Sequence, residues 1–410
     1  MNAWDYFVNL LPNVRSSFVE WLQGLHLASS LIVFLDSLIG IILILLIVFP
    51  VVMAFIWLER RFIARMQLRP GPNRCGPFGF FQPVADAVKV LTKEFIMPAK
   101  GDRLVHWVAP ILMFFAALMV FAVFPIGAGP KGAFSDLNIG ILYVVAIGSL
   151  GVIGIFMAGW ASNNKYSLIG AVRGVAQLIS YEVPMVLAIV GVILIVGSLQ
   201  MGEIVGKQTI PYILLQPLGF LIYFIGALTE INRSPMDLIE ADSELTAGYF
   251  TEYSGMKFAM FYLGEYINAL AVSIIVTTLF LSGWKGPFLP MWFWFTLKVF
   301  GVFMFILWMR ATLVRLRIDQ VMAFSWKGLL PLALINVFIT AAEVLAWDSW
   351  MPGWESFPWP FVFVNLAIAV VLIVLWAKLF FKPGGGRIEA GGLRDRYSQG
   401  YGVNPQAPVS

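Results

Sequence analysis

The chain has 410 residues, of which 60% are apolar and only 12% are charged, and its formal net charge is +4. In a soluble domain roughly a quarter of the residues are charged, so this composition excludes a soluble globular protein. One cysteine and two histidines also exclude a disulfide framework and leave no His/Cys cluster for zinc, iron–sulfur or haem ligation. No metal site and no nucleic-acid partner are expected.

Apolar runs of about 20 residues recur along the chain, and each is long enough for a membrane-spanning helix. We therefore predict an all-α, polytopic membrane helix bundle with nine spans, near 31–57, 104–125, 138–160, 170–198, 211–231, 258–282, 291–312, 328–347 and 361–381. An outside N-terminus and a cytoplasmic C-terminus place most Lys and Arg residues in internal loops, as the positive-inside rule requires. The domain prediction is one transmembrane domain, 31–381, between a retained interfacial extension, 1–30, and a flexible cytoplasmic tail, 382–410.

The first internal loop, 59–103, is about 45 residues long, whereas most connections need only a handful. It begins with the basic, turn-forming stretch ERRFIARMQLRPGPNRCGP and continues as QPVADAVKVLTKEF, where Pro83 suits a first helical position. Apolar residues then alternate with Asp86, Lys89 and Lys93 at helical spacing, which predicts a short helix in the membrane interface. Positive charge beside anionic lipid explains the basic residues but not Asp86 or the turn, so a specific site is favoured.

A second unusual stretch, the acidic cytoplasmic loop 230–257, gathers the densest group of carboxylates in the chain. Asp237, Glu240 and Glu244 are spaced so that a helix would place three like charges on one face, which is self-repelling. A solvated loop would relieve this repulsion. The alternative is a set of coupled acids that lines a polar cavity.

Three carboxyl groups stand where hydrocarbon is expected. Glu182 lies inside the fourth span just before Pro184, Glu230 closes the fifth span, and Glu265 lies one to two turns into the sixth. All three approach from the predicted cytoplasmic side, as a proton path leading from the acidic loop requires. The alternative is that each is a hydrogen-bonded acid that locks helices together, or is solvated near the surface.

Three other ionisable groups have simpler explanations. Lys298 in the seventh span is either a counter-ion or a side chain that snorkels to the outer surface. Asp36 and Glu343 are close to outer span ends and are expected to be solvated.

Three long motifs carry a resemblance to a known family: ERRFIARMQLRPGPNRCGP, GWASNNKYSLIGAVRGVAQLISYEVP and LTEINRSPMDLIEADSELTAGYFTEYSGMKFAMFYLGEY. These motifs resemble those of the H subunit of the proton-pumping NADH:quinone oxidoreductase, respiratory complex I, and the resemblance covers roughly residues 31 to 345. Motifs of this length are far more specific than a short pattern. The first thirty residues, the ninth span and the tail lie outside the shared core.

The resemblance implies a membrane subunit that forms much of a quinone-reduction chamber. By this resemblance, Arg60, Arg69, Asp86 and Lys89 line or support the chamber. The acids that match those assigned to coupling quinone reduction to proton translocation are Glu182, Glu230, Glu240, Asp242, Glu244 and Glu265. Asp242 stands where the family pattern has glutamate, and its shorter side chain weakens that assignment.

The resemblance also implies partners and a location. Quinone is a substrate, and FMN, iron–sulfur clusters and NAD belong to partner subunits, because this chain has no residues to hold a redox group. The partners are hydrophilic iron–sulfur and quinone-site subunits, antiporter-like membrane subunits and membrane lipid, in the bacterial plasma membrane.

Two other functions compete with this interpretation. The homologous membrane anchor of an energy-converting hydrogenase has similar motifs in the same two loops, and only its partner subunits differ. A stand-alone ion-coupled transporter would use the same buried acids, but the sequence has no inverted repeat and no matching pair of interrupted helices.

Overall fold

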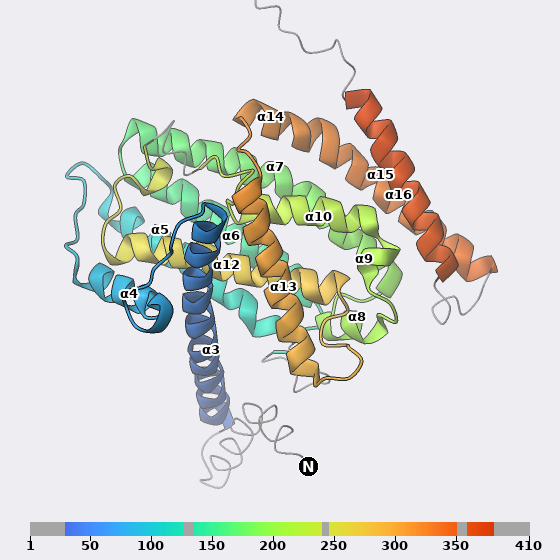
Figure 1. Cartoon of the computed structure of the whole chain (residues 1–410), viewed down its shortest axis with the longest axis horizontal. Coiled ribbons are helices and arrows are strands. Elements are labelled where there is room, and N and C mark those ends of the chain that lie inside the picture. Colours follow the sequence, from blue (N-terminus) through green and yellow to red (C-terminus); the bar gives the residue numbers. More distant parts are fainter. Residues whose placement is uncertain (1–28, 126–134, 240–245, 351–358, 381–410) are drawn as a thin grey trace, which may run out of the picture. The chain divides into compact units, whose positions relative to one another are not determined.

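The computed structural model describes residues 29–125, 135–239, 246–350 and 359–380, and every regular element in these ranges is helical (Figure 1). A segment in hydrocarbon has to satisfy its own backbone hydrogen bonds, which a helix does. The predicted all-α membrane fold is confirmed for these ranges, where eight helical stretches are long and apolar enough to cross a membrane. They comprise α3 (Ser29–Met66), α5 (Arg103–Met119) with η2 (Val120–Val123), α6 (Gly140–Ala161), α7 (Lys165–Val196), α12 (Met256–Phe280), α13 (Met291–Thr312), α14 (Ile318–Ala323) with η4 (Phe324–Leu329) and α15 (Leu330–Trp350), and α16 (Trp359–Phe380).

Of the nine predicted spans, the fifth is the one that the structure does not form as a single long helix. The segment predicted as 211–231 consists of a single turn, α9 (Tyr212–Leu215), and the 14-residue helix α10 (Pro217–Glu230). Proline disfavours a helical conformation at the residue before it, and Gln216 accordingly has φ −131° and ψ 65°. The helix is thereby shortened below the roughly 20 residues that a span needs. The side of the membrane on which each terminus lies stays a prediction.

Helix α7 lies at the centre of the core and packs against α6, α10 and α15. Small residues permit the closest of these contacts, because a Cβ atom at Gly159 of α6 would lie 2.2 Å from the Cβ of Ala171 in α7. The glycines of α6 do not all serve this purpose. A Cβ at Gly151 would have nothing within 4 Å, and one at Gly148 would meet a carboxylate described below.

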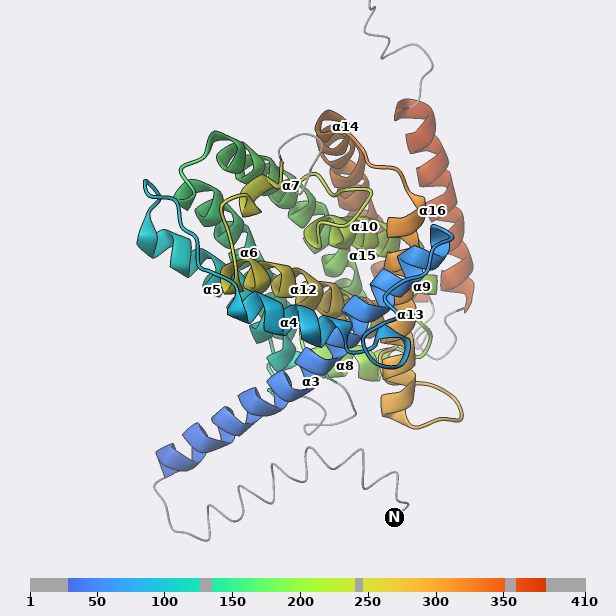
Figure 2. The ribbon, with the colours of Figure 1, turned by 60° about the vertical axis from the view of Figure 1, so that its left-hand side comes forward.

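The first internal loop begins later than predicted. Helix α3 continues to Met66, so the residues from Glu59 to Arg65 are helical, since nothing in ERRFIARM breaks a helix. Pro83 does begin a helix as predicted: α4 (Gln82–Thr92) has proline in its first turn. Helix α4 lies beside α12 and α3 (Figure 2). Its interfacial position stays a prediction.

The chain divides into two compact units, 1–366 and 367–410. All the sites considered below are in the first unit. In the second, the described residues continue α16 to Phe380.

Candidate functional site

A cavity between α6, α7, α10 and α12 brings together the three acids that the sequence places at membrane depth. Glu182, Glu230 and Glu265 all line it, although they come from three different helices. Its other polar side chains are Ser149, Tyr181, Tyr223, Asn232 and Asn268. About 60 Å³ of it is open to the centres of water molecules, and one water needs only ~10–15 Å³. The cavity can therefore hold several waters between the acids.

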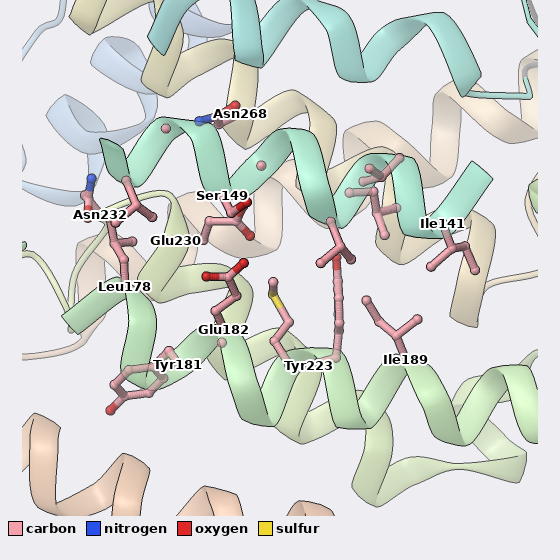
Figure 3. A pocket seen from close by; sticks show the side chains of 18 of the residues that line it. Ile141, Ser149, Leu178, Tyr181, Glu182, Ile189, Tyr223, Glu230, Asn232 and Asn268 are labelled. Atoms are coloured by element: carbon pink, nitrogen blue, oxygen red, sulfur yellow. The ribbon is translucent and has the colours of Figure 1, made fainter. Parts of the chain in front are cut away.

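Glu182 of α7 and Glu230 at the end of α10 face each other across this cavity (Figure 3). Room for the second carboxylate comes from α6, because a Cβ atom at Gly148 would lie 3.2 Å from Glu230 Oε1. Two carboxyl groups that face each other in a site of low dielectric disfavour double ionisation. Such a pair can take up and release a proton.

Helix α7 is continuous, but one of its backbone hydrogen bonds is missing next to Glu182. Pro184 has no N–H, so the carbonyl of Ser180 lacks its helical donor. The Ser325 hydroxyl in the π-helix η4 donates to that carbonyl at 2.5 Å instead. A second hydrogen bond connects the two segments in the opposite direction, because the Tyr181 hydroxyl of α7 donates to the carbonyl of Val321 at 2.9 Å. Short π-helical turns occur frequently at functional sites, and this one fixes the part of α7 that carries the cavity acid.

Glu265 is held from the acidic loop. The Tyr249 hydroxyl donates to Glu265 Oε1 at 3.3 Å, and both side chains are buried. The neighbouring Tyr266 is also buried, and the Arg233 guanidinium lies 4.5 Å from its ring centroid in a cation–π contact.

A buried ion triplet completes this side of the site. Glu59 of α3 is 3% exposed, and its Oε1 accepts hydrogen bonds from Arg233, at 3.3 Å, and from Arg310 of α13. Sequence reasoning missed these three residues, since it placed Glu59 at the start of a loop. The available signal was that Glu59 and Arg310 both end long apolar runs, where a buried charge has to find a partner.

Two of the four predicted chamber residues meet. Arg60 of α3 forms an ion pair with Asp86 of α4, and each side chain is about one-third exposed. Arg69 is exposed and donates to Gln67 at 2.7 Å, and Lys89 is also exposed. The structure therefore joins Arg60 with Asp86 and leaves the other two at the surface.

The RPGPN turn is anchored to α3 by its neighbour Phe78. Trp57 Nε1 and Arg61 Nη1 both donate to the Phe78 carbonyl, at 3.1 and 3.2 Å, and the Arg61 guanidinium lies 4.9 Å from the Phe78 ring centroid. Past this turn, an apolar stripe is open to lipid, a partner subunit or a ligand. Its members are Val84, Val88, Leu91 and Phe95, each at least half exposed.

The two predicted clusters are connected by a series of contacts, which we call the linking series. It begins with the ion pair of Asp86 and Arg60, and Arg60 interacts electrostatically with Tyr262 of α12. The Tyr262 and Tyr266 hydroxyls are 3.2 Å apart, and Tyr266 in turn stacks with Arg233. Tyr266 follows Glu265 in the chain, and Arg233 follows Asn232, another residue that lines the cavity.

The remaining acids and the lysine singled out in the sequence lie outside this cavity or outside the described residues. Glu240, Asp242 and Glu244 lie outside the described residues, while 231–239 forms turns and bends. Glu343 is not solvated as expected, since both its carboxylate oxygens are buried between neighbouring side chains. Lys298 does not pair with an acid among the described residues, and whether it snorkels stays a prediction. Its ammonium donates to the carbonyls of Leu281, Gly283 and Lys285 at 2.7–3.0 Å, because the turn after α12 leaves these acceptors without helical donors.

The comparisons with known proteins agree on one family. A sequence model described as NADH dehydrogenase matches residues 39–341. The chain is 56% identical over 338 residues to the H subunit of NADH-quinone oxidoreductase from Dehalococcoides mccartyi, an alignment that covers 82% of this chain and 93% of that protein. It is 45% identical over 337 residues to the protein of the same name in Carboxydothermus hydrogenoformans, covering 81% and 96%. The corresponding protein of Protochlamydia amoebophila is 51% identical over 294 residues, covering 70% and 90%.

Proposed function

This chain belongs to the NADH dehydrogenase family of complex I membrane subunits, and from that premise we propose that it forms much of a quinone chamber and couples quinone reduction to proton translocation. The observation that carries the proposal is the linking series, which extends from Asp86 on α4 to Arg233, the residue next to Asn232 in the lining of the acid cavity.

The chamber is the first part of the proposal. A quinone has an apolar tail and a polar head, so it needs a lipid-facing entrance and a few polar groups at the end. The exposed apolar stripe of α4 offers the first, and the ion pair of Arg60 with Asp86 lies on the other side of the same helix. Arg69 and Lys89 stay proposed chamber residues, as exposed cations that a partner subunit can cover.

Coupling is the second part. Reduction of a quinone by two electrons creates negative charge, which draws protons and attracts the Arg60 guanidinium. A shift of Arg60 changes its interactions with Asp86 and Tyr262. This change is passed on to Arg233 and Glu59 through the contacts of the linking series. Because Glu59 is the one carboxylate shared by Arg233 and Arg310, a movement of Arg233 changes the balance of this ion triplet beside Asn232, which lines the acid cavity. Glu240, Asp242 and Glu244 are proposed to supply protons to this path.

The partners follow from the chemistry that this chain lacks. We propose that FMN, iron–sulfur clusters and NAD are held by hydrophilic partner subunits, that antiporter-like membrane subunits lie alongside, and that the complex is in the bacterial plasma membrane. The N-terminus is proposed to lie outside and the tail, 382–410, in the cytoplasm. The relatives' names favour this function over a hydrogenase anchor or a stand-alone transporter.

The test compares native membranes with Asp86→Asn and Glu230→Gln at matched abundance of the complex. We expect Asp86→Asn to lower quinone turnover by about tenfold, because it removes the carboxylate that pairs with Arg60. Glu230→Gln should lower turnover and proton pumping together, while NADH oxidation by an artificial acceptor persists in both. Native rates in both variants would show that these acids are structural.

A further inference from the structure

A buried lysine lies outside the acid cavity and the linking series. Lys257, in the first turn of α12, is only 3% exposed, and His106 of α5 is completely buried. Lys257 Nζ lies 2.9 Å from His106 Nδ1 and 4.0 Å from the ring centroid of Trp107. Because an ammonium group can only donate, Nδ1 is the acceptor and the imidazole carries its hydrogen on Nε2. The pair thus holds one positive charge against an aromatic face.

This pair supports the segment 246–255, which closes the acidic loop. The His106 ring stacks on that of Tyr253, with centroids 4.1 Å apart and planes 4° from parallel. Glu252, the next residue back, is the acid that interacts electrostatically with His106, and its Oε1 accepts a hydrogen bond from Asn164 at 2.8 Å. Burial raises the pKa of the Tyr253 hydroxyl, so the ring stacks in its neutral form.

The same segment is fastened to the end of the chamber helix. The Ser254 hydroxyl donates to the carbonyl of Glu94 at 3.1 Å, just past α4. Gly255, at φ +60°, lies so close that a Cβ there would be 3.2 Å from the carbonyl oxygen of Lys93 and 3.4 Å from that of Glu94. Phe95 also packs on Trp107, with centroids 6.0 Å apart. A displacement at the end of α4 therefore reaches segment 246–255 directly.

The other end of the segment reaches the cavity, since Tyr249 is the donor to Glu265. Segment 246–255 is accordingly in contact with α4 on one side and a cavity acid on the other. Packing alone does not require a positively charged side chain next to segment 246–255. Removing a charge from water is costly, and apolar side chains of similar volume fill such sites at least as stably. A lysine buried here is thus explained by its charge.

We propose that Lys257 and His106 are positioning residues for coupling, and that their shared positive charge holds segment 246–255 in register between α4 and Glu265. This provides a second connection between chamber and cavity, separate from the linking series. The inference rests on the proposed function, because it concerns the transmission of a quinone signal to the same acids.

The experiment uses the whole complex in membranes and separates charge from packing. Lys257→Met removes the charge and keeps much of the volume, whereas Lys257→Arg keeps the charge. His106→Phe keeps a ring on Tyr253 without an acceptor, whereas His106→Gln keeps an acceptor. Lys165→Met, at an exposed lysine at the start of α7, is the matched control. The measurements are abundance of the complex, NADH oxidation by an artificial acceptor, KM and kcat for quinone, and protons pumped per NADH.

We expect Lys257→Met and His106→Phe to lower the protons pumped per NADH at least threefold, with little change in KM or in artificial-acceptor activity. Lys257→Arg, His106→Gln and Lys165→Met should stay within a factor of two of the native ratio. If Lys257→Met fails to assemble, the two His106 variants decide: a lower ratio in His106→Phe alone supports the inference, and equal ratios overturn it.

Two outcomes would overturn the role in coupling. The first is a native ratio of protons pumped per NADH in Lys257→Met. The second is a reduced abundance of the complex in both His106 variants while the remaining complex pumps at the native ratio, which indicates a purely structural pair. Glu230→Gln assayed in the same membranes separates this inference from its premise. A defect in Glu230→Gln with native Lys257→Met refutes only the positioning role, whereas a native Glu230→Gln refutes the proposed function itself.

Discussion

The hydrogen bond from Ser325 to the Ser180 carbonyl allows a quantitative test of how α7 compensates for the backbone hydrogen bond lost at Pro184. Ser325→Ala removes the donor to a carbonyl that Pro184 has already deprived of its helical partner. Both residues are buried, and an unsatisfied buried acceptor costs about 1–3 kcal/mol. For a chain of this size, each kcal/mol lowers Tm by roughly 1 °C, so the expected decrease is roughly 1–4 °C.

The assay is thermal denaturation of the detergent-purified complex, with Ser349→Ala as the control. Ser349 is an exposed serine of the same helix region whose hydroxyl donates to Ala346 of its own helix, so its loss should have almost no effect. A second comparison isolates the mechanism. In a Pro184→Ala background the backbone N–H of residue 184 can serve the Ser180 carbonyl, so Ser325→Ala should cost at least ~1 kcal/mol less there. Equal costs of Ser325→Ala in the two backgrounds would refute the reasoning.

Two further predictions concern the ion triplet and the cavity. Glu59→Gln leaves two guanidinium groups around a neutral side chain, and breaking a buried ion pair costs about 3–5 kcal/mol. Immunoblots of membranes should therefore show less assembled complex, and quinone turnover should decrease. Wild-type abundance and turnover would contradict this prediction. Gly148→Ala should lower coupled turnover several-fold without loss of assembly, because the new methyl group displaces the Glu230 carboxylate from its position. Gly40→Ala, in α3 away from the cavity and with nothing within 4 Å, is its control, and equal turnover in the two variants would argue against a role for the carboxylate position.

The prolines of the long helices also show why the number of spans was harder to predict than their existence. Pro184 and Pro50 lie inside long helices, whereas Pro217 shortens one. The sequence contains the same residue in each case. At Pro184 a neighbouring side chain, Ser325, supplies a hydrogen bond to the carbonyl that the proline leaves without its helical donor, whereas the residue before Pro217 leaves the helical conformation.

The sequence by itself determined the class of fold and most helices, because about 20 apolar residues in lipid can satisfy their backbone only as a helix. It also identified the acids of the cavity, since a carboxyl group inside an apolar run is costly enough to stand out without any structure. The start of α4 at Pro83 was likewise a local property.

Only the tertiary structure decided which of these groups meet. Glu59 and Arg233 are 174 positions apart, and Lys257 and His106 are 151 apart, yet each pair is in contact. No periodicity in the chain encodes such pairings, because they depend on which helix faces turn toward each other when the bundle packs. The charges could be found in the sequence, but their partners, and hence the connections between chamber and cavity, arise from the packing of α3, α5, α12 and α13.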